Sequence, residues 1–237
     1  MKTVGVLGGF GPETTAEFYV SVIEKNRKLN TNSHPEMLIH NSPVPFSLEE
    51  DAVKNAKGLD KFLPILLNGL KIIQDKVDFV VLPCNTLHIF IEDLRSASKK
   101  PVVSIIDEMV NEVKSRNLKR VGLLATMKTF KEKLYENKLK ENGVRVVKPD
   151  AHDIVRLSQI IHLLLQGVKS DALKTELLVI IEDLKRKGAE ELILGCTDLQ
   201  LLILPEHSPL KLIDTIDVLA NSTVRLMNEK EDSDVER

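Results

Sequence analysis

Two cysteines are the residues of this 237-residue sequence whose type and placement most clearly suggest chemistry. Cys84 lies in LPCNTLHIF and Cys196 in LGCTDLQLL, so each follows an aliphatic run and precedes Asn-Thr or Thr-Asp. A thiolate on one face of a carbon and a thiol on the other could invert a stereocentre by proton transfer. Asn85, Thr86 and Thr197 could donate hydrogen bonds to the substrate carboxylate while the carbanion exists.

The position of each cysteine also predicts an ionisable thiol. Each thiol is expected at the carboxyl end of a strand, where the N-terminus of a following helix would lower a pKa that is ordinarily about 8.5. A plainer alternative is that both cysteines are small buried hydrophobes, and that Asn85, Thr86, Thr197 and Asp198 only cap helices. We favour a paired function because the two cysteines occupy matching places in an internal repeat.

Metal binding is a second alternative for the same residues. His88 lies four residues after Cys84, and Asp198 lies two residues after Cys196. The sequence has no Cys-x2-Cys or His-x3-His pair, the spacings that zinc sites commonly use. We therefore predict no metal site.

Short aliphatic runs alternate with longer amphipathic stretches along the chain. Continuous Val, Ile and Leu runs of this length are typical of parallel strands covered on both faces. The intervening stretches 13–29, 58–76 and 172–188 carry apolar residues three and four apart, which predicts helices. The alternation predicts an α/β fold with mostly parallel sheets. Strands are predicted at residues 3–8, 37–40, 78–82, 102–106, 121–125, 144–147, 191–195 and 211–214.

The chain also repeats itself. Residues 78–113 can be laid over residues 190–223, with strand, cysteine, polar turn, helix and a second strand in the same order. The repeat predicts two pseudo-symmetric three-layer α/β/α domains, with the active site in the cleft between them and one cysteine on each wall. The expected N-terminal half comprises residues 1–100 and about 213–229, the C-terminal half residues 101–212, and a charged tail residues 230–237.

Composition narrows the class of protein. Hydrophobic residues make up 43% of the chain and charged residues 29%, with a net charge of -2, which is typical of a globular protein without a nucleic-acid surface. No apolar stretch approaches the roughly 20 residues that cross a bilayer. We expect a cytoplasmic protein with no nucleic-acid or membrane partner, in which the thiols stay reduced.

Four stretches, GVLGGFGPETTAEFY, LPCNTLHIF, GLLAT and LGCTD, resemble the aspartate/glutamate racemase superfamily of cofactor-independent amino-acid racemases. The resemblance is strongest to the aspartate racemase branch and runs from Lys2 to about Met227. It implies two pseudo-symmetric α/β domains, a homodimer, a small-molecule amino-acid substrate and no pyridoxal phosphate. It also implies that Cys84 and Cys196 are the two proton-transferring thiols.

The same resemblance implies a substrate site around the thiols. Asn85, Thr86 and Thr197 would bind the amino and carboxylate groups, and Thr126 and Thr129 would line the same pocket. The full predicted set of substrate-binding residues is Gly9, Phe10, Ser47, Asn85, Thr86, Thr126, Thr129, His162, Gln166, Thr197 and Asp198.

Two departures from the family pattern concern the substrate side chain. Aspartate racemases typically have Asp-Arg-Thr after a proline, where this chain has Phe46, Ser47 and Leu48. A lysine of the family is replaced by Gln166. Without these cations the chain lacks the contacts that select a dicarboxylate, unless Lys169 or Arg156 takes their place.

The glycine loop GGFGP suggests dinucleotide binding as an alternative. Gly8, Gly9 and Gly11 follow a strand and precede a helix, but their spacing is not G-x-G-x-x-G. The loop could instead bring backbone N–H groups close to a carboxylate, or serve only as a tight turn.

His162 and Gln166 lie one helical turn apart. If their shared face points to the cleft, they would form a subsite for the substrate side chain. The alternative is that His162 is a core histidine.

These observations predict a cofactor-independent amino-acid racemase that acts on aspartate, glutamate or another small amino acid through Cys84 and Cys196. One alternative is a related two-cysteine enzyme, such as a maleate isomerase, a hydantoin racemase or a decarboxylase. Another is an amino-acid binding protein without catalysis.

Overall fold

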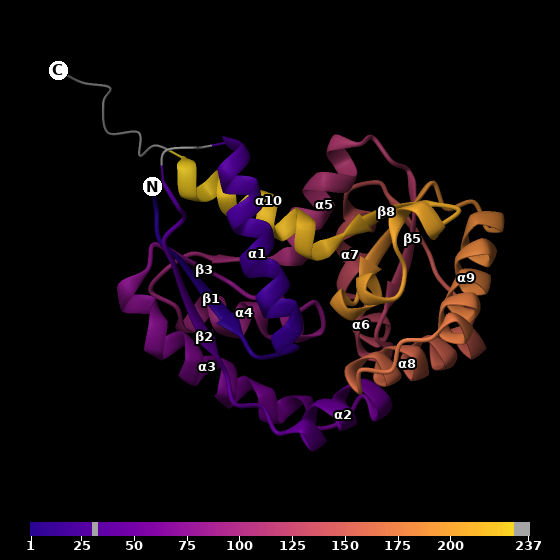
Figure 1. Cartoon of the computed structure of the whole chain (residues 1–237), viewed down its shortest axis with the longest axis horizontal. Coiled ribbons are helices and arrows are strands. Elements are labelled where there is room, and N and C mark those ends of the chain that lie inside the picture. The colour runs from indigo at the N-terminus through magenta and orange to yellow at the C-terminus, as the bar shows by residue number, and fades with distance from the viewer. Residues whose placement is uncertain (30–32, 230–237) are drawn as a thin grey trace.

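The protein consists of two four-stranded parallel sheets, each flanked by helices (Figure 1). The computed structural model describes residues 1–29 and 33–229. The strand orders are β2-β1-β3-β4 and β6-β5-β7-β8, which is the same topology twice. The strands are β1 Val4–Gly8, β2 Met37–Asn41, β3 Phe79–Val81, β4 Val102–Val103, β5 Arg120–Ala125, β6 Arg145–Val147, β7 Glu191–Gly195 and β8 Lys211–Asp214.

All eight predicted strand positions contain a strand, and one predicted boundary is wrong by more than one residue. The predicted strand 102–106 ends at Val103, because Ser104 caps the helix that follows. The Ser104 hydroxyl accepts a hydrogen bond from the backbone N–H of Asp107 at 3.2 Å. The apolar residues Ile105 and Ile106 therefore belong to a helix, a distinction that hydrophobicity alone does not make.

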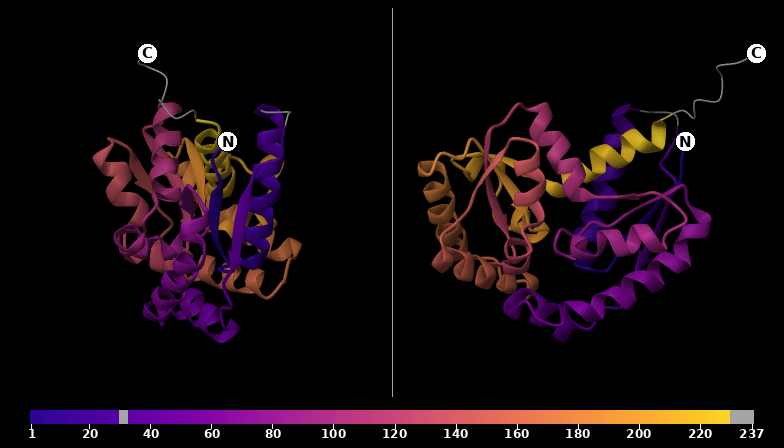
Figure 2. Two further views of the ribbon diagram at one scale, coloured as in Figure 1. Left: turned by 90° about the vertical axis from the view of Figure 1, so that its left-hand side faces the viewer. Right: turned by 180° about the vertical axis from the view of Figure 1, so that it is seen from behind.

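The helices confirm the three predicted helical stretches and lie on both faces of the sheets (Figure 2). Short 3₁₀ turns follow the strands at Thr86–Phe90 and Thr197–Leu201. The α-helices are α1 Pro12–Leu29, α2 Phe46–Asn55, α3 Phe62–Ile73, α4 Ile91–Ala97, α5 Ile105–Ser115, α6 Met127–Lys131, α7 Leu134–Glu141, α8 Ala151–Leu165, α9 Asp171–Arg186 and α10 Thr215–Asn228.

The last helix of each half packs on the other half. Helix α10 leaves β8 of the second sheet and packs along α1 of the first half, while α5 leaves β4 of the first sheet and packs on α7 and α10 (Figure 1). Strand pairing assigns β4 to the first sheet and β8 to the second. The chain thus crosses between the halves near residues 104 and 215, a few residues beyond the boundaries expected from the repeat.

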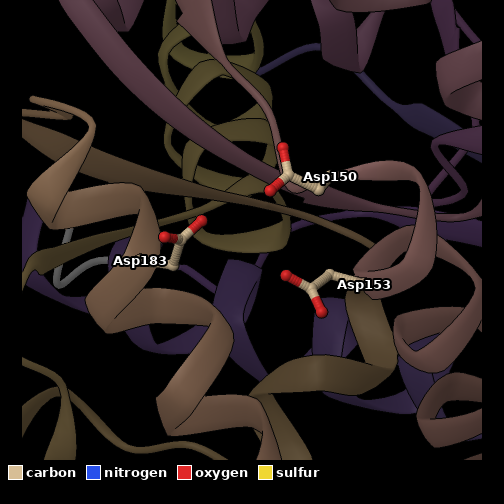
Figure 3. A group of neighbouring side chains, drawn as sticks. All are labelled: Asp150, Asp153 and Asp183. Carbon is tan, nitrogen blue, oxygen red and sulfur yellow. The ribbon is translucent and has the colours of Figure 1, made fainter.

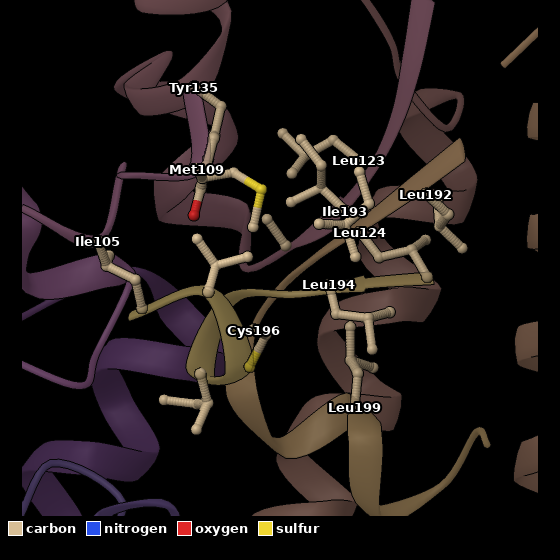
Figure 4. Close-up of a cluster of buried hydrophobic side chains, with 14 of the residues drawn as sticks. Ile105, Met109, Leu123, Leu124, Tyr135, Leu192, Ile193, Leu194, Cys196 and Leu199 are labelled. Atoms are coloured by element: carbon tan, nitrogen blue, oxygen red, sulfur yellow. The ribbon is translucent and has the colours of Figure 1, made fainter. Parts of the chain in front are cut away.

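The buried core forms two clusters. In the first half, Leu66 and Leu70 of α3 pack against one face of the sheet, through Leu7 and Val80. The other cluster runs through both halves, from Phe18 of α1 to the second sheet. Figure 4 shows the part of this cluster around the second sheet. The halves are therefore joined by shared apolar packing as well as by the chain.

No helix within residues 1–29 and 33–229 is long and apolar enough to cross a membrane. The predicted charged tail, residues 230–237, lies outside the described residues.

Candidate active site

Both cysteines line one cavity between the two halves. Cys84 follows β3 and Cys196 directly follows β7, so both stand at the carboxyl ends of parallel strands, where open α/β sheets bind ligands. The cavity offers about 60 Å³, which is room for a few water molecules. It is lined by Phe10, Gly11, Glu49, Ala52, Val53, Leu59, Phe62, Cys84, Asn85, Thr86, Leu87, Thr126, Leu165, Cys196, Thr197 and Asp198.

Cys196 is buried and has a carboxylate as its partner. Its thiol donates a hydrogen bond to Asp198 Oδ2 at 3.5 Å, and its side chain lies at the edge of the large apolar cluster (Figure 4). Burial, followed by the negative charge of Asp198, raises the pKa of the Cys196 thiol well above its ordinary value. Burial also raises the pKa of Asp198. The thiol proton of Cys196 is therefore directed at a carboxylate oxygen of Asp198.

Cys84 is half-buried and is surrounded by backbone donors instead. Burial raises the pKa of its thiol to about 12, although the backbone N–H groups of Leu87 and Thr86 act in the opposite direction. The predicted lowering of the thiol pKa values is thus wrong for both cysteines. The helix-start N–H groups are present at Cys84, but loss of solvent outweighs them.

The polar residues after Cys84 do not act as side-chain caps. Asn85 donates from Nδ2 to Thr215 Oγ1 at 3.0 Å, and its Oδ1 accepts a hydrogen bond from the Tyr135 hydroxyl. Thr215 in turn donates to the carbonyl of Leu194 at 3.0 Å. Asn85 of the first half is therefore fixed by two buried residues from α7 and α10, neither of which was predicted.

Threonine hydroxyls from both halves meet at the cavity. Thr86 Oγ1 lies 3.0 Å from Thr126 Oγ1 and 3.4 Å from Thr129 Oγ1, and the last two are 3.1 Å apart. Thr126 also caps α6 by accepting a hydrogen bond from Thr129 N. Thr129 is fully buried behind the cavity wall. On the other side, Thr14 donates to Thr197 Oγ1 at 3.2 Å.

His88 is a structural residue in the turn after Cys84. Its Nδ1 lies 2.7 Å from the Cys84 carbonyl, and its Nε2 accepts a hydrogen bond from the Ile105 backbone N–H at 3.0 Å. Both ring nitrogens are thus engaged by the backbone, and burial lowers the His88 pKa to about 4. This occupancy removes His88 from the metal-ligand set considered as an alternative.

The glycine loop needs its glycines for close packing. Gly9 has φ 91°, and a Cβ there would lie 2.4 Å from the Ser42 carbonyl oxygen. Its N–H donates to Thr15 Oγ1 at 3.2 Å. Gly11 has φ 87°, and its backbone N–H group favours the ionised form of Glu49. The loop thus brings a backbone N–H group close to a carboxylate, and this carboxylate is the side chain of Glu49.

Glu49 is a cavity residue that sequence reasoning missed. It lies on α2 with Ala52 and Val53, three and four residues along, and all three line the cavity. Burial raises the pKa of Glu49, and the charges of Asp198 and Glu13 raise it further. An acidic residue on the apolar stripe of SLEEDAV was the available signal.

Several predicted substrate residues lie outside the cavity lining. Ser47 is exposed on α2, and Gln166 is exposed at the end of α8, where Leu165 lines the cavity instead. His162 lies with Nε2 3.4 Å from Glu50 Oε1 of α2. Gly9 packs against the backbone of Ser42 and does not line the cavity, whereas its neighbour Phe10 does.

Arg156 also lies outside the cavity lining. It forms an ion pair with Glu176 of α9 and donates a hydrogen bond to Gln159 at 2.8 Å, so its charge is engaged away from the cavity.

Three carboxylates gather at one other place among the described residues. Asp150 precedes α8, Asp153 lies on it and Asp183 lies on α9 (Figure 3). The Lys187 ammonium contacts Asp150 at 2.8 Å and Asp183 at 2.7 Å. This ion-pair network accounts for the cluster.

The fold and the site together define a two-domain α/β protein with a thiol from each half in one interdomain cavity. The sequence profile described as Asp/Glu/Hydantoin racemase matches residues 7–223. The chain therefore belongs to the Asp/Glu/Hydantoin racemase family, and the predicted resemblance is confirmed.

Relatives and solved structures agree with this assignment. The chain is 30% identical over 229 residues to the broad specificity amino-acid racemase RacX of Bacillus subtilis, covering 93% of this chain and 96% of that protein. An aspartate racemase homologue from Pyrococcus horikoshii is 28% identical with a TM-score of 0.78, covering 97% and 100% of the two chains. The aspartate racemase of Picrophilus torridus is 22% identical, with a TM-score of 0.81 and coverage of 97% and 96%, and shares the fold.

Proposed function

We propose that this protein racemises an amino acid with Cys84 and Cys196 as the two proton carriers. The observation that supports this most directly is that the two thiols, one from each half, line the same cavity. Membership of a racemase family gives the reaction class. An acid and a base on opposite faces of one carbon are what inversion requires.

The proposed reaction has two proton transfers. A thiolate removes the α-proton, so that the Cα–H bond breaks, an S–H bond forms and the electron pair passes into the substrate carboxylate. The opposite thiol then donates its proton to the other face and is left as the thiolate. The roles exchange for the other enantiomer.

The resting surroundings of the two thiols differ. The Leu87 and Thr86 N–H groups favour the thiolate of Cys84, while the charge of Asp198 disfavours both thiolates and lies directly beside Cys196. The ammonium group of a bound amino acid would lower both pKa values, because it brings a positive charge into a buried site. In the direction that starts at Cys196, Asp198 can accept the thiol proton across their 3.5 Å hydrogen bond.

Hydroxyl groups are available to hold the substrate carboxylate. Thr86, Thr126 and Thr197 line the cavity, and their hydroxyl groups form hydrogen bonds with other threonine hydroxyl groups. Exchanging these bonds for bonds to a carboxylate would stabilise the charge that develops there during proton removal.

The residues also fit a reaction that uses no pyridoxal phosphate. A pyridoxal enzyme binds its cofactor through a lysine Schiff base. Among residues 1–29 and 33–229, no lysine lines this cavity. We therefore extend the proposal to a cofactor-independent reaction.

Solvent-deuterium incorporation tests the proposal. Each L- and D-amino acid of a panel is incubated with the protein in D₂O and followed by NMR at the α-carbon and by chiral chromatography. Exchange with inversion is expected for at least one amino acid, and Cys84→Ala or Cys196→Ala should abolish it. Inversion that persists in either variant would contradict the two-thiol mechanism.

The alternatives give other results in the same experiment. A binding protein would show ligand-induced melting shifts without exchange. A maleate isomerase, a hydantoin racemase or a decarboxylase would leave the whole amino-acid panel unexchanged and convert its own substrate class. Either result would overturn the proposed amino-acid racemase.

A further inference from the structure

One wall of the cavity carries a carboxylate among apolar side chains. Glu49, Ala52 and Val53 form one face of α2, and all three line the cavity. Phe10 and Phe62 line it as well, with ring centroids 6.1 Å apart. This wall therefore combines an apolar surface with one negative charge.

The carboxylate has no positive partner in the cavity. Of the described residues that line it, Glu49 and Asp198 are the charged ones, and none is Lys, Arg or His. The backbone N–H of Gly11 is the group that favours the ionised form of Glu49. Glu49 is half-buried, and a carboxylate whose charge is favoured by one backbone N–H group is stabilised further when a cation joins it.

The two carboxylates have different surroundings. Asp198 accepts a hydrogen bond from the thiol of Cys196, so it lies next to the part of the cavity where the proposed reaction needs the α-carbon. Glu49 comes from a helix that carries neither thiol, and its helical neighbours in the cavity are apolar. Glu49 is therefore available to the side chain of the substrate.

We propose that Glu49 selects an amino acid with a positively charged side chain, such as lysine, ornithine or arginine. This proposal rests on the proposed racemase function. The methylene groups of such a side chain would pack against Phe10, Phe62 and Val53, and its charged end would pair with Glu49. A dicarboxylate would place a second negative charge beside Glu49.

Helices α2 and α8 add no cation to this wall. Ser47 of α2 and Gln166 at the end of α8 are uncharged and exposed, and no Lys or Arg among the described residues of these helices lines the cavity. Helix α2 also packs against α8 across the cavity.

A pair of amino acids of nearly equal size measures the effect of charge. Lysine and norleucine share their carbon chain and differ by the terminal ammonium group. We expect racemisation of lysine over norleucine, and over glutamate, by a factor of about 10 to 100 in kcat/KM. Glu49→Gln should bring the lysine-to-norleucine ratio close to one, and Glu49→Asp should retain part of the preference.

Asp51→Asn is the matched control, because it removes one carboxylate from the exposed side of the same helix. It should leave the ratio unchanged. If Glu49→Gln lowers lysine and norleucine equally, Glu49 binds the α-ammonium group and the proposal is wrong. A wild-type preference for glutamate or norleucine would also overturn it.

Binding distinguishes this proposal from failure of the proposed function. Calorimetric titration of lysine and norleucine into wild type and Glu49→Gln reports charge selection without any turnover. A lysine preference that depends on Glu49, in a protein with no α-carbon exchange, would support the subsite and refute the racemase. Exchange at the α-carbon without a lysine preference would support the racemase and refute the subsite.

Discussion

The turns after β3 and β7 occupy equivalent places in the two halves, but they surround their thiols differently. Cys84 is followed by Asn85 and Thr86, and Cys196 by Thr197 and Asp198. Thr86 joins a cluster of hydroxyl groups with Thr126, whereas Asp198 accepts a hydrogen bond from the neighbouring thiol. The same backbone topology thus carries a neutral second residue in one half and an acidic one in the other.

The two halves thus share the position of the thiol and differ in the charge next to it. Strand order and turn position fix where each sulfur lies. The second residue after the cysteine changes the charge beside the sulfur, and through it the ease of ionisation. Two thiols in symmetric positions therefore have different neighbours, and in the proposed mechanism this difference suits a pair that must present one thiol and one thiolate.

Removing either sulfur should have the largest effect. Cys84→Ala and Cys196→Ala are each expected to reduce racemisation by about 1,000-fold or more, since one face of the α-carbon then lacks its proton carrier. Chiral chromatography from both enantiomers measures the loss. A variant that keeps more than a tenth of the activity would show that the two halves do not contribute equally essential groups.

Replacing the second residues should separate the halves. Asp198→Asn is expected to reduce kcat about 100-fold in the direction where Cys196 is the base, and less in the other direction. Thr86→Val should mainly raise KM, through lost contact with the substrate carboxylate. Kinetics from L and D substrates would contradict this assignment if both variants acted equally in both directions.

Alkylation should rank the two thiols. Cys84 is half-buried whereas Cys196 is buried, so iodoacetamide should modify Cys84 about ten-fold faster than Cys196. The Cys84 rate should rise about ten-fold per pH unit towards pH 12, because burial raises its pKa to about 12. Asp198→Asn should narrow the gap, as peptide mass spectrometry of the modified protein would reveal.

Two groups near the strand ends should affect acid stability in opposite directions. Burial lowers the His88 pKa to about 4, so its stabilisation is complete above about pH 6.5 and is lost as the pH falls towards 4. Burial raises the Asp214 pKa to about 6, so protonation of Asp214 favours the folded state in the same range. His88→Gln should remove up to about 1 kcal/mol per pH unit of the acid decline.

Urea unfolding between pH 4 and 6.5 measures this slope, and Asp214→Asn should make it steeper. Equal slopes in wild type and His88→Gln would mean that His88 is protonated in the folded protein.

The contact between α2 and α8 should give the smallest effect. Glu50 is half-exposed and lies 3.4 Å from His162. Glu50→Gln should change the free energy of unfolding by less than about 1 kcal/mol. His162→Ala should leave substrate preference unchanged, because His162 does not line the cavity. A changed preference would restore His162 to the side-chain subsite.

Local patterns predicted the positions of all eight strands and the residues beside the cysteines. Uninterrupted aliphatic runs identify buried parallel strands, and motifs that follow strand ends converge in space, so Cys84, Thr86, Cys196 and Asp198 meet as expected.

Long-range packing supplied the rest. Tyr135 and Thr215 reach Asn85 from elements 50 and 130 residues away, and no local signal marks them. Glu49 enters the cavity because α2 spans the two halves. The acidity of the thiols was mispredicted because burial, which depends on the whole fold, outweighs the nearby N–H groups.

The exchange of α5 and α10 between the halves makes the chain difficult to divide. Helix α10 covers α1, although nearly the whole sequence separates them. During synthesis the first 103 residues emerge before α10 exists, so Phe18 and Val22 of α1 cannot complete their packing until the whole chain has been made. We therefore expect that neither half folds stably when it is expressed without the other.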